Sequence, residues 1–312
     1  MGRQAGPGAI KEKTLMQITL LDGSVGQEVV KRSGERPTPL WSASVMMDQP
    51  DLVGAVHGDY FAAGATIATT NTYTVHRDRL LRAGREDRFE TLLDIAMAQA
   101  KAARDAHGGG RIAAALGPLG ASYRPDLNIP LQEAARLFAE LVRLTEDTAD
   151  LFLIETASSL AQARGALMGC CATSKPVWLA VSVKDDDGSR LRSGEPLMDL
   201  APVLAEFQPA AVLINCSRPE VIGAGLEILQ RFDRPFGAYA NGFTGITDGF
   251  LQEAPTVDAL QQRQDLGPAE YAQFVMGWVA MGATIVGGCC EVGPGHIAEL
   301  AHQLRAAGHE II

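Results

Sequence analysis

Residues 211–232 read AVLINCSRPEVIGAGLEILQRF, and this stretch carries the pattern that decides the fold. It begins with AVLINC (211–216), a short run that is apolar until its last two residues. After a turn, residues 219–232 have the apolar spacing of an amphipathic helix. Continuous apolar runs suit strands buried on both faces, and strands joined through helices must be parallel. The stretch therefore predicts one strand–helix unit of a parallel α/β fold.

The same kind of unit recurs along the whole chain. We predict further helices at 88–106, 131–147 and 268–282, and a last helix from about 295 to 305. The eight predicted strands are ITLLDGS (18–24), ATIATTNTY (65–73), IAAALGP (112–118), LFLIET (151–156), VWLAVSV (177–183), AVLINC (211–216), PFGAYAN (235–241) and TIVGGCC (284–290).

Eight such units without a break in composition indicate a single α/β (β/α)₈ TIM barrel. We expect a flexible N-terminal tail over residues 1–14 and the barrel domain over residues 15–312. A doubly wound open sheet is the alternative, because periodicity does not show whether the sheet closes. Residues 30–51 and 242–267 follow strand ends and are rich in Pro, Gly, Asp and Gln, so we expect them to build the barrel mouth.

Composition narrows the class of protein. The 312 residues are 46% hydrophobic and 21% charged, which supplies a large core. The formal charge of -10 and the lack of a basic run argue against a nucleic-acid partner. No stretch approaches the length of a membrane span, and the first 13 residues lack the apolar centre of a signal peptide. We therefore expect a cytoplasmic protein that binds no membrane.

The residues at the predicted strand tips are unusually reactive. In a parallel barrel, the chemistry is concentrated at the C-terminal ends of the strands. Strands six and eight end in Cys216 and in the pair Cys289 and Cys290, which could converge on one point. Three thiolates suit zinc, and a catalytic zinc site keeps its fourth position open. We assign the other pair, Cys170 and Cys171, to ordinary packing because it falls in a predicted helix end.

Other strand tips offer groups that could bind a substrate. Asp22 and Glu155 end strands one and four, and together they could bind the ammonium group of an amino acid. Asn71 and Asn241 end strands two and seven, and we expect both at the substrate site. Each carboxylate could instead cap a following helix.

The motifs taken in order resemble the zinc-dependent homocysteine S-methyltransferase family. They are DGSVGQEV, WSASVM, DYFAAGA, TTNTYTV, IET, LINC, YANG and GGCC, over roughly residues 15 to 306. The combination of an NC strand tip with a later GGCC is specific, whereas the short matches alone are not. The resemblance implies a (β/α)₈ barrel in which Cys216, Cys289 and Cys290 bind Zn²⁺, and it places Asp22 and Glu155 near the homocysteine amino group. It also implies that Asn215 supports the metal site and that Gly288 allows the adjacent cysteine pair.

The resemblance further implies methyl transfer to the homocysteine sulfur, giving methionine. The expected donor is a sulfonium or a betaine, with S-methylmethionine the best candidate. Trp41 and Tyr73 could hold such a cation through their ring faces. Two motifs depart from the family: DGS stands where relatives commonly have DGG or DGA, and GGCCEVGPGHI stands where many have GGCCGT.

Two other hypotheses stay open from the sequence. The acceptor could be another thiol or a selenol. Alternatively, the cysteines could hold a structural metal, or none, beside a different chemistry. The sequence leaves the oligomeric state open.

Overall fold

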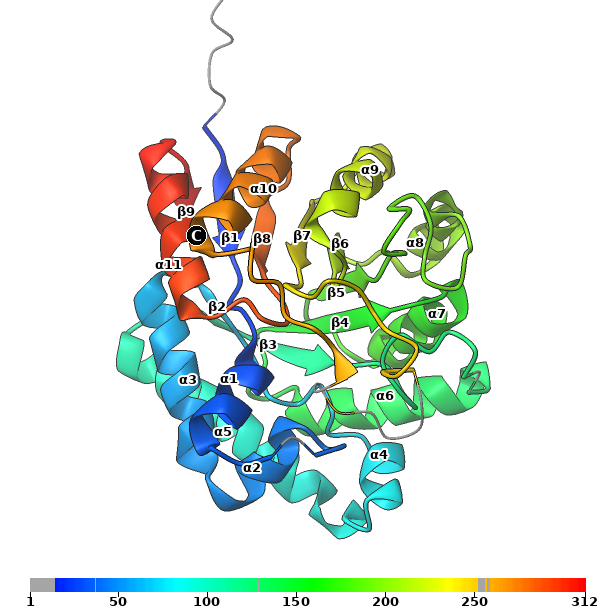
Figure 1. Ribbon diagram of the computed structural model, residues 1–312. Coiled ribbons are helices and arrows are strands. Elements are labelled where there is room, and N and C mark those ends of the chain that lie inside the picture. The colour runs from blue at the N-terminus through cyan, green and yellow to red at the C-terminus, as the bar shows by residue number, and fades with distance from the viewer. Residues whose placement is uncertain (1–14, 37, 128, 252–255, 257–258) are drawn as a thin grey trace, which may run out of the picture.

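The computed structural model describes residues 15–36, 38–127, 129–251, 256 and 259–312. The predicted tail over residues 1–14 lies outside the described residues. The strands form a central sheet, and helices surround it (Figure 1). The strands are β1 Gln17–Leu20, β2 Ile67–Thr69, β3 Arg111–Leu116, β4 Leu151–Ala157, β5 Val177–Val181, β6 Ala211–Asn215, β7 Phe236–Ala240, β8 Ile285–Gly288 and β9 Glu310–Ile311.

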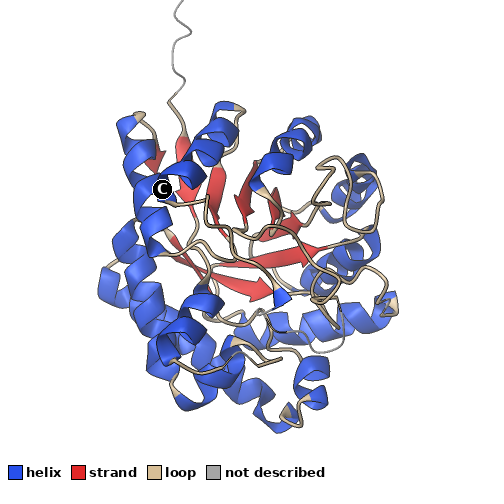
Figure 2. Ribbon diagram, viewed as in Figure 1, coloured by secondary structure: helices blue, strands red, loops and turns tan. Residues whose placement is uncertain are grey.

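Helices separate most of the strands in the chain and lie on the outside of the sheet (Figure 2). The α-helices are α1 Val25–Ser33, α2 Ser42–Asp48, α3 Pro50–Ala63, α4 Arg77–Arg82, α5 Phe89–His107, α6 Leu131–Thr145, α7 Leu160–Gly169, α8 Ala201–Phe207, α9 Pro219–Leu229, α10 Pro268–Ala280 and α11 Pro294–Ala306. Short 3₁₀ turns are η1 Glu86–Arg88, η2 Cys170–Ala172, η3 Leu197–Leu200 and η4 Gln230–Phe232.

The sheet closes on itself as a TIM barrel. Its parallel strands follow the order β2-β3-β4-β5-β6-β7-β8-β1-β9. A parallel bridge between Leu21 and Ile67 joins β1 to β2, and the Thr66 amide donates to the Leu20 carbonyl at 2.8 Å. The predicted (β/α)₈ barrel is therefore confirmed, and the open doubly wound sheet is excluded.

The apolar runs form strands because both of their faces are buried. In β4, Leu151 and Leu153 pack inside the barrel, whereas Phe152 and Ile154 pack against the surrounding helices. Side chains that alternate between two buried environments give a run without polar interruptions. This arrangement explains why continuous apolar segments located all eight barrel strands.

One strand differs from the sequence interpretation. The chain does not end in the helix: Ile311 in β9 pairs with Ile18, and the Ile312 amide donates to the Ile18 carbonyl at 2.9 Å. A two-residue strand is too short to carry a periodic signal. His57 is buried in α3 with 1% of its surface exposed. Among the described residues, no helix is long and apolar enough to span a membrane.

The described parts of the two long loops expected at the mouth both reach it, and residues 37, 252–255 and 257–258 of these loops lie outside the described residues. Residues 30–51 contain α2 and bring Trp41 into the site cavity. The segment between β7 and α10 crosses the open end of the barrel in yellow and orange (Figure 1). Phe250 from this segment contacts Trp41 and Tyr123 edge to face, with ring centroids 6.0 and 5.7 Å apart.

Candidate active site

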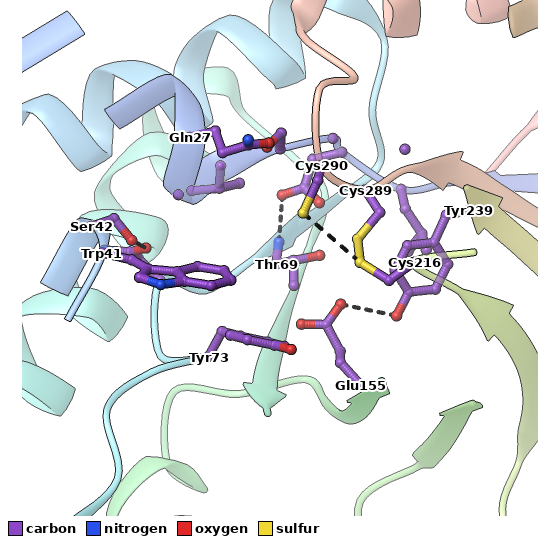
Figure 3. A pocket seen from close by; sticks show the side chains of 18 of the residues that line it. Gln27, Trp41, Ser42, Thr69, Tyr73, Glu155, Cys216, Tyr239, Cys289 and Cys290 are labelled. Atoms are coloured by element: carbon purple, nitrogen blue, oxygen red, sulfur yellow. Dashed lines mark hydrogen bonds between the residues drawn. A yellow bond between two sulfur atoms is a disulfide. The ribbon is translucent and has the colours of Figure 1, made fainter. Parts of the chain in front are cut away.

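A cavity of about 100 Å³ lies at the C-terminal ends of the barrel strands. We call it the sulfur cavity because all three strand-tip cysteines line it (Figure 3). Trp41 and Tyr73 lie on one side of it, and Cys216 and Tyr239 lie on the other. Its lining comprises Leu21, Asp22, Gly23, Ser24, Val25, Gly26, Gln27, Trp41, Ser42, Thr69, Thr70, Asn71, Tyr73, Thr74, Tyr123, Glu155, Cys216, Tyr239, Gly288, Cys289 and Cys290.

The three cysteines converge as the strand-tip argument predicts. Their Sγ atoms all lie within 4.8 Å of one another. Cys216 and Cys289 are joined as a disulfide with an S–S distance of 2.17 Å, and Cys290 Sγ lies 3.9 Å from Cys216 Sγ. Burial raises the pKa of the Cys290 thiol to about 12, and Glu291 and Glu155 add to this shift.

The cysteines fit a thiolate-bound metal once the disulfide is reduced. Zinc–sulfur bonds of about 2.3 Å in a tetrahedron put the sulfur atoms about 3.8 Å apart. The spacing of Cys216 and Cys290, 3.9 Å, already matches this distance. Cys289 must separate from Cys216 to complete the set, and its side chain lies in the open cavity where it can do so. The donor set is therefore chemically suited to a metal ion.

Gly288 serves this turn differently from the sequence interpretation. A residue with a Cβ is disfavoured by the backbone itself where φ is positive, but neither Gly287 nor Gly288 has a positive φ. A Cβ on Gly288 would instead lie 2.1 Å from Val292 Cγ1. Glycine is needed here because β8 packs directly against the segment that follows the cysteines.

Two buried carboxylates lie in the same cavity. Asp22 is 2% exposed and accepts a 2.6 Å hydrogen bond from the Thr69 amide. Glu155 is 8% exposed and accepts a 2.9 Å hydrogen bond from the Tyr239 hydroxyl. Burial raises the pKa of Asp22 to about 8 and that of Glu155 to about 7. Carboxyl groups held in this way gain stability from a cationic partner, which favours their ionised form.

Asn215 bonds to Thr156, the residue that follows Glu155. Its Oδ1 accepts from the Thr156 amide at 2.9 Å, and its Nδ2 donates to the Thr156 hydroxyl at 3.0 Å. Thr156 has a φ of 59°, at an irregularity in the pairing of β4 with β5. Asn215 thus fixes the strained turn directly after Glu155.

The opposite side of the cavity is aromatic. Trp41 and Tyr73 stack with ring centroids 6.0 Å apart at an angle of 19°. The Tyr73 hydroxyl bonds to the Ser122 hydroxyl at 2.8 Å. Asn71, which also lines the cavity, accepts a 2.5 Å hydrogen bond from Ser42 through its Oδ1. The aromatic pair and Asn71 therefore reach the cavity as the sequence suggested.

Asn241 does not reach the sulfur cavity. It is 1% exposed, its Oδ1 accepts from the Phe243 amide at 3.3 Å, and its own amide donates to the Ser217 carbonyl. The side chain therefore shapes the start of the long loop after β7. The strand-tip argument misplaced it because a tip position does not determine which way a side chain points.

The sequence argument missed Tyr239, which lines the cavity, and Arg192, which contacts two of the lining residues. Tyr239 lies inside β7, one residue before the end of the strand, and an inward-facing tyrosine in an apolar strand was the available signal. Arg192 places its guanidinium 4.7 Å from the Tyr123 ring centroid and donates to the Cys216 carbonyl at 3.3 Å. Its long-range partners leave no local pattern in the sequence.

Gln27 and Glu291 hold each other beside Cys290. Gln27 Nε2 donates to Glu291 Oε1 at 2.6 Å, and the Glu291 amide donates to Gln27 Oε1 at 2.6 Å. The Ser24 hydroxyl also donates to Gln27 Oε1 at 2.6 Å. Glu291 has a φ of 65°, the left-handed region that favours glycine. Burial raises the pKa of Glu291.

Comparison with known proteins gives a consistent family. The family model for homocysteine S-methyltransferase matches residues 19–304. The homocysteine S-methyltransferase YbgG of Bacillus subtilis (strain 168) is 28% identical over 309 residues, which cover 93% of this chain and 95% of that protein. A homocysteine S-methyltransferase of Escherichia coli (strain K12) is also 28% identical and covers 91% of this chain and 94% of its own length.

Solved structures agree with the sequence relatives. The metallated form of the homocysteine methyltransferase MmuM from Escherichia coli has a TM-score of 0.76 and 27% identity, with 94% of this chain and 97% of that chain covered. Its oxidized form has a TM-score of 0.78 and 26% identity, with coverages of 95% and 98%. Fold, converging cysteines and matched length agree: the chain belongs to the homocysteine S-methyltransferase family.

Proposed function

We propose that the chain transfers a methyl group from a sulfonium or betaine-type donor to homocysteine, giving methionine, with S-methylmethionine as the preferred donor. We further propose that Cys216, Cys289 and Cys290 hold Zn²⁺ for this reaction. One observation carries the proposal: the three Sγ atoms lie within 4.8 Å of one another in a cavity that also contains Asp22 and Glu155.

The ligand set suits an activated thiol. When bound, zinc keeps a coordinated substrate thiol in its thiolate form at neutral pH. Three protein ligands leave the fourth tetrahedral position for that sulfur. The metallated form of the Escherichia coli relative supports the choice of a metal here, and the three-thiolate donor set favours zinc.

The remaining residues would orient the two substrates. We assign the homocysteine ammonium group to Asp22 and Glu155, which share the cavity with the cysteines and have no cation within 4.0 Å in the described part of the chain. Thr69 and Tyr239 hold these carboxylates in place by hydrogen bonds. The cavity walls would exclude bulk water from the carboxylates and the bound ammonium group, which would strengthen the attraction between these opposite charges.

The donor would lie against the aromatic side. Trp41 and Tyr73 offer ring faces to a sulfonium or quaternary ammonium centre. In the transfer, the homocysteine sulfur forms a bond to the methyl carbon as the donor C–S or C–N bond breaks. The bonding electron pair leaves with the donor heteroatom, so thiolate and cation become a neutral thioether and a neutral leaving group. The chain's task is mainly to align these atoms.

Turnover with defined donors tests the proposal. Reduced, zinc-loaded protein should form methionine from homocysteine and S-methylmethionine. Trp41→Leu should raise the KM for the donor roughly fivefold or more, with a smaller change for Trp41→Phe, which retains a ring face. No methionine from any sulfonium or betaine donor by zinc-loaded protein would reject the proposal. Turnover with only another thiol or a selenol would replace the acceptor.

A further inference from the structure

A second cavity adjoins the sulfur cavity and has a different character. Its volume is about 790 Å³, and we call it the outer cavity. It lies between the beginnings of α1 and α11 and is lined by Glu28, Lys31, Glu291 and His296 among others. Four residues line both cavities, so the two spaces meet along a common wall: Ser24, Gly26, Gln27 and Trp41.

Glu291 stands at this junction and is fixed in position. It follows Cys290 directly, so its backbone lies one residue from a proposed metal ligand. The reciprocal hydrogen bonds with Gln27 engage its amide and its Oε1. Gln27 is held in turn by Ser24. The carboxylate is therefore set in a defined orientation on the wall of the outer cavity.

Glu291 forms no ion pair with any of the described residues. Among the described residues, no Lys, Arg or His nitrogen lies within 4.0 Å of its carboxylate, and no hydrogen bond reaches Oε2. Glu28, in the same cavity, differs: Lys31 lies 3.8 Å from it and Arg32 lies 3.2 Å from it. A fixed carboxylate without a partner beside a cavity is suited to a cationic ligand.

The backbone conformation at Glu291 is one that disfavours residues with a side chain. A residue with a side chain is disfavoured in the left-handed region, whereas glycine is not. This chain carries Glu291 at φ 65° in this region. The strain alone indicates no ligand, but it shows that a carboxylate stands where the backbone does not favour one.

We propose that Glu291 determines donor specificity by binding the α-ammonium group of an amino-acid sulfonium donor. The inference rests on the proposed function and deepens it. The donor would occupy the outer cavity and pass Gln27 and Trp41, so that its sulfonium centre meets the sulfur cavity. Gln27 bonds to the Glu291 carboxylate and also lines the sulfur cavity, so one side chain links the ammonium site to the cavity of the methyl acceptor. This arrangement suits a donor whose two cations are separated only by a short aliphatic spacer.

This assignment separates two classes of donor. S-methylmethionine carries a sulfonium and an ammonium group, whereas dimethylsulfonioacetate carries a sulfonium and a carboxylate but no ammonium group. Only the first gains a charge-assisted hydrogen bond from Glu291. The structure therefore assigns the preference for amino-acid donors to one residue outside the cysteine set.

The test compares Glu291→Gln with a matched charge-neutralising variant. Glutamine keeps the size of the side chain and an oxygen that can accept from Gln27. Glu299→Gln is the control, because Glu299 lies on α11, bonds to Gln303 and lines neither cavity. Kinetics are measured for both donors with zinc-loaded protein, together with the KM for homocysteine.

Glu291→Gln should raise the KM for S-methylmethionine about tenfold to a hundredfold, because the variant loses one hydrogen bond between charged groups. The KM for dimethylsulfonioacetate and for homocysteine should change less than about twofold. Glu299→Gln should leave all three values near those of the wild type. Equal effects on both donors, or a rise confined to homocysteine, would overturn the inference.

A binding measurement separates this inference from the proposed function. Calorimetric titration of S-methylmethionine into zinc-loaded protein without homocysteine requires no turnover. Binding that weakens about tenfold or more in Glu291→Gln supports the inference even if no methyl transfer occurs. Equal binding to wild type and variant, or no binding to either, contradicts it. Absence of turnover with intact binding would reject only the proposed function.

Discussion

The Tyr239 hydroxyl, on β7, donates a 2.9 Å hydrogen bond to Oε1 of Glu155, on β4, although β5 and β6 separate the two strands in the sheet. Both residues line the sulfur cavity, and both are nearly fully buried. The bond lowers the pKa of Glu155 against the rise caused by burial. It therefore helps to keep the carboxylate ionised for an ammonium ligand.

Tyr239→Phe should weaken homocysteine binding. The variant removes the bond that orients Glu155 and favours its charge, at a cost of about 1–3 kcal/mol, so the KM for homocysteine should rise roughly fivefold to a hundredfold. The donor KM should stay near the wild-type value. A donor KM that rises as much as the homocysteine KM would show that Tyr239 shapes the whole cavity instead.

Asn215→Ala should lower stability and displace Glu155. The variant leaves the buried Thr156 amide without its hydrogen-bond acceptor, which costs about 1–3 kcal/mol in the free energy of unfolding. Denaturant unfolding measures this loss, and zinc content should remain that of the wild type. Zinc loss at unchanged stability would instead place Asn215 in direct support of the metal ligands.

The free energy of unfolding should depend on His57 below neutral pH. Burial lowers the pKa of His57 from 6.5 to about 4, and neither ring nitrogen has a hydrogen-bond partner among the described residues. Between these values the unfolded chain binds a proton that the folded chain does not, so stability falls as the pH drops from about 6.5 towards 4.

The contribution of His57 should be on the order of 2 kcal/mol between pH 7.5 and 5. His57→Phe removes the titrating group and should give a smaller loss of stability over that interval. Urea unfolding at the two pH values measures the difference. An unchanged pH dependence in the variant would assign the acid sensitivity to other groups.

Removal of the metal should allow one pair of cysteines, Cys216 and Cys289, to oxidise to a disulfide. Cys216 and Cys289 are in disulfide contact, whereas Cys170 and Cys171 lie at the end of α7, away from the cavity. Metal-stripped protein in air should lose two free thiols and yield a peptide cross-link between Cys216 and Cys289, and prior zinc loading should prevent it. A cross-link through Cys171 would contradict this assignment.

The barrel could be predicted from the sequence because each of its strands is marked by a local pattern of apolar residues. The barrel strands are mostly apolar because both of their faces are buried, and Cys216, Cys289 and Cys290 directly follow two of these apolar runs. Asn71, Trp41 and Tyr73 also reach the cavity as predicted.

The remaining site features depend on contacts between distant segments. Asn241 points into its loop, Asn215 bonds to β4, and Gln27 meets Glu291 across a sequence separation of 264 residues. The two residues of β9 form a strand only because they pair with β1. No periodicity or residue spacing in the sequence predicts any of these contacts.

The central claim is that the three cysteines hold zinc for methyl transfer to homocysteine. Elemental analysis of freshly reduced protein, paired with an assay of methionine from homocysteine and S-methylmethionine, tests it most directly in wild type, Cys289→Ser and Cys171→Ser, an exposed-cysteine control. We expect about one zinc per chain and methionine formation in wild type and Cys171→Ser, and loss of both in a folded Cys289→Ser. Methionine formation by protein without metal would contradict the account.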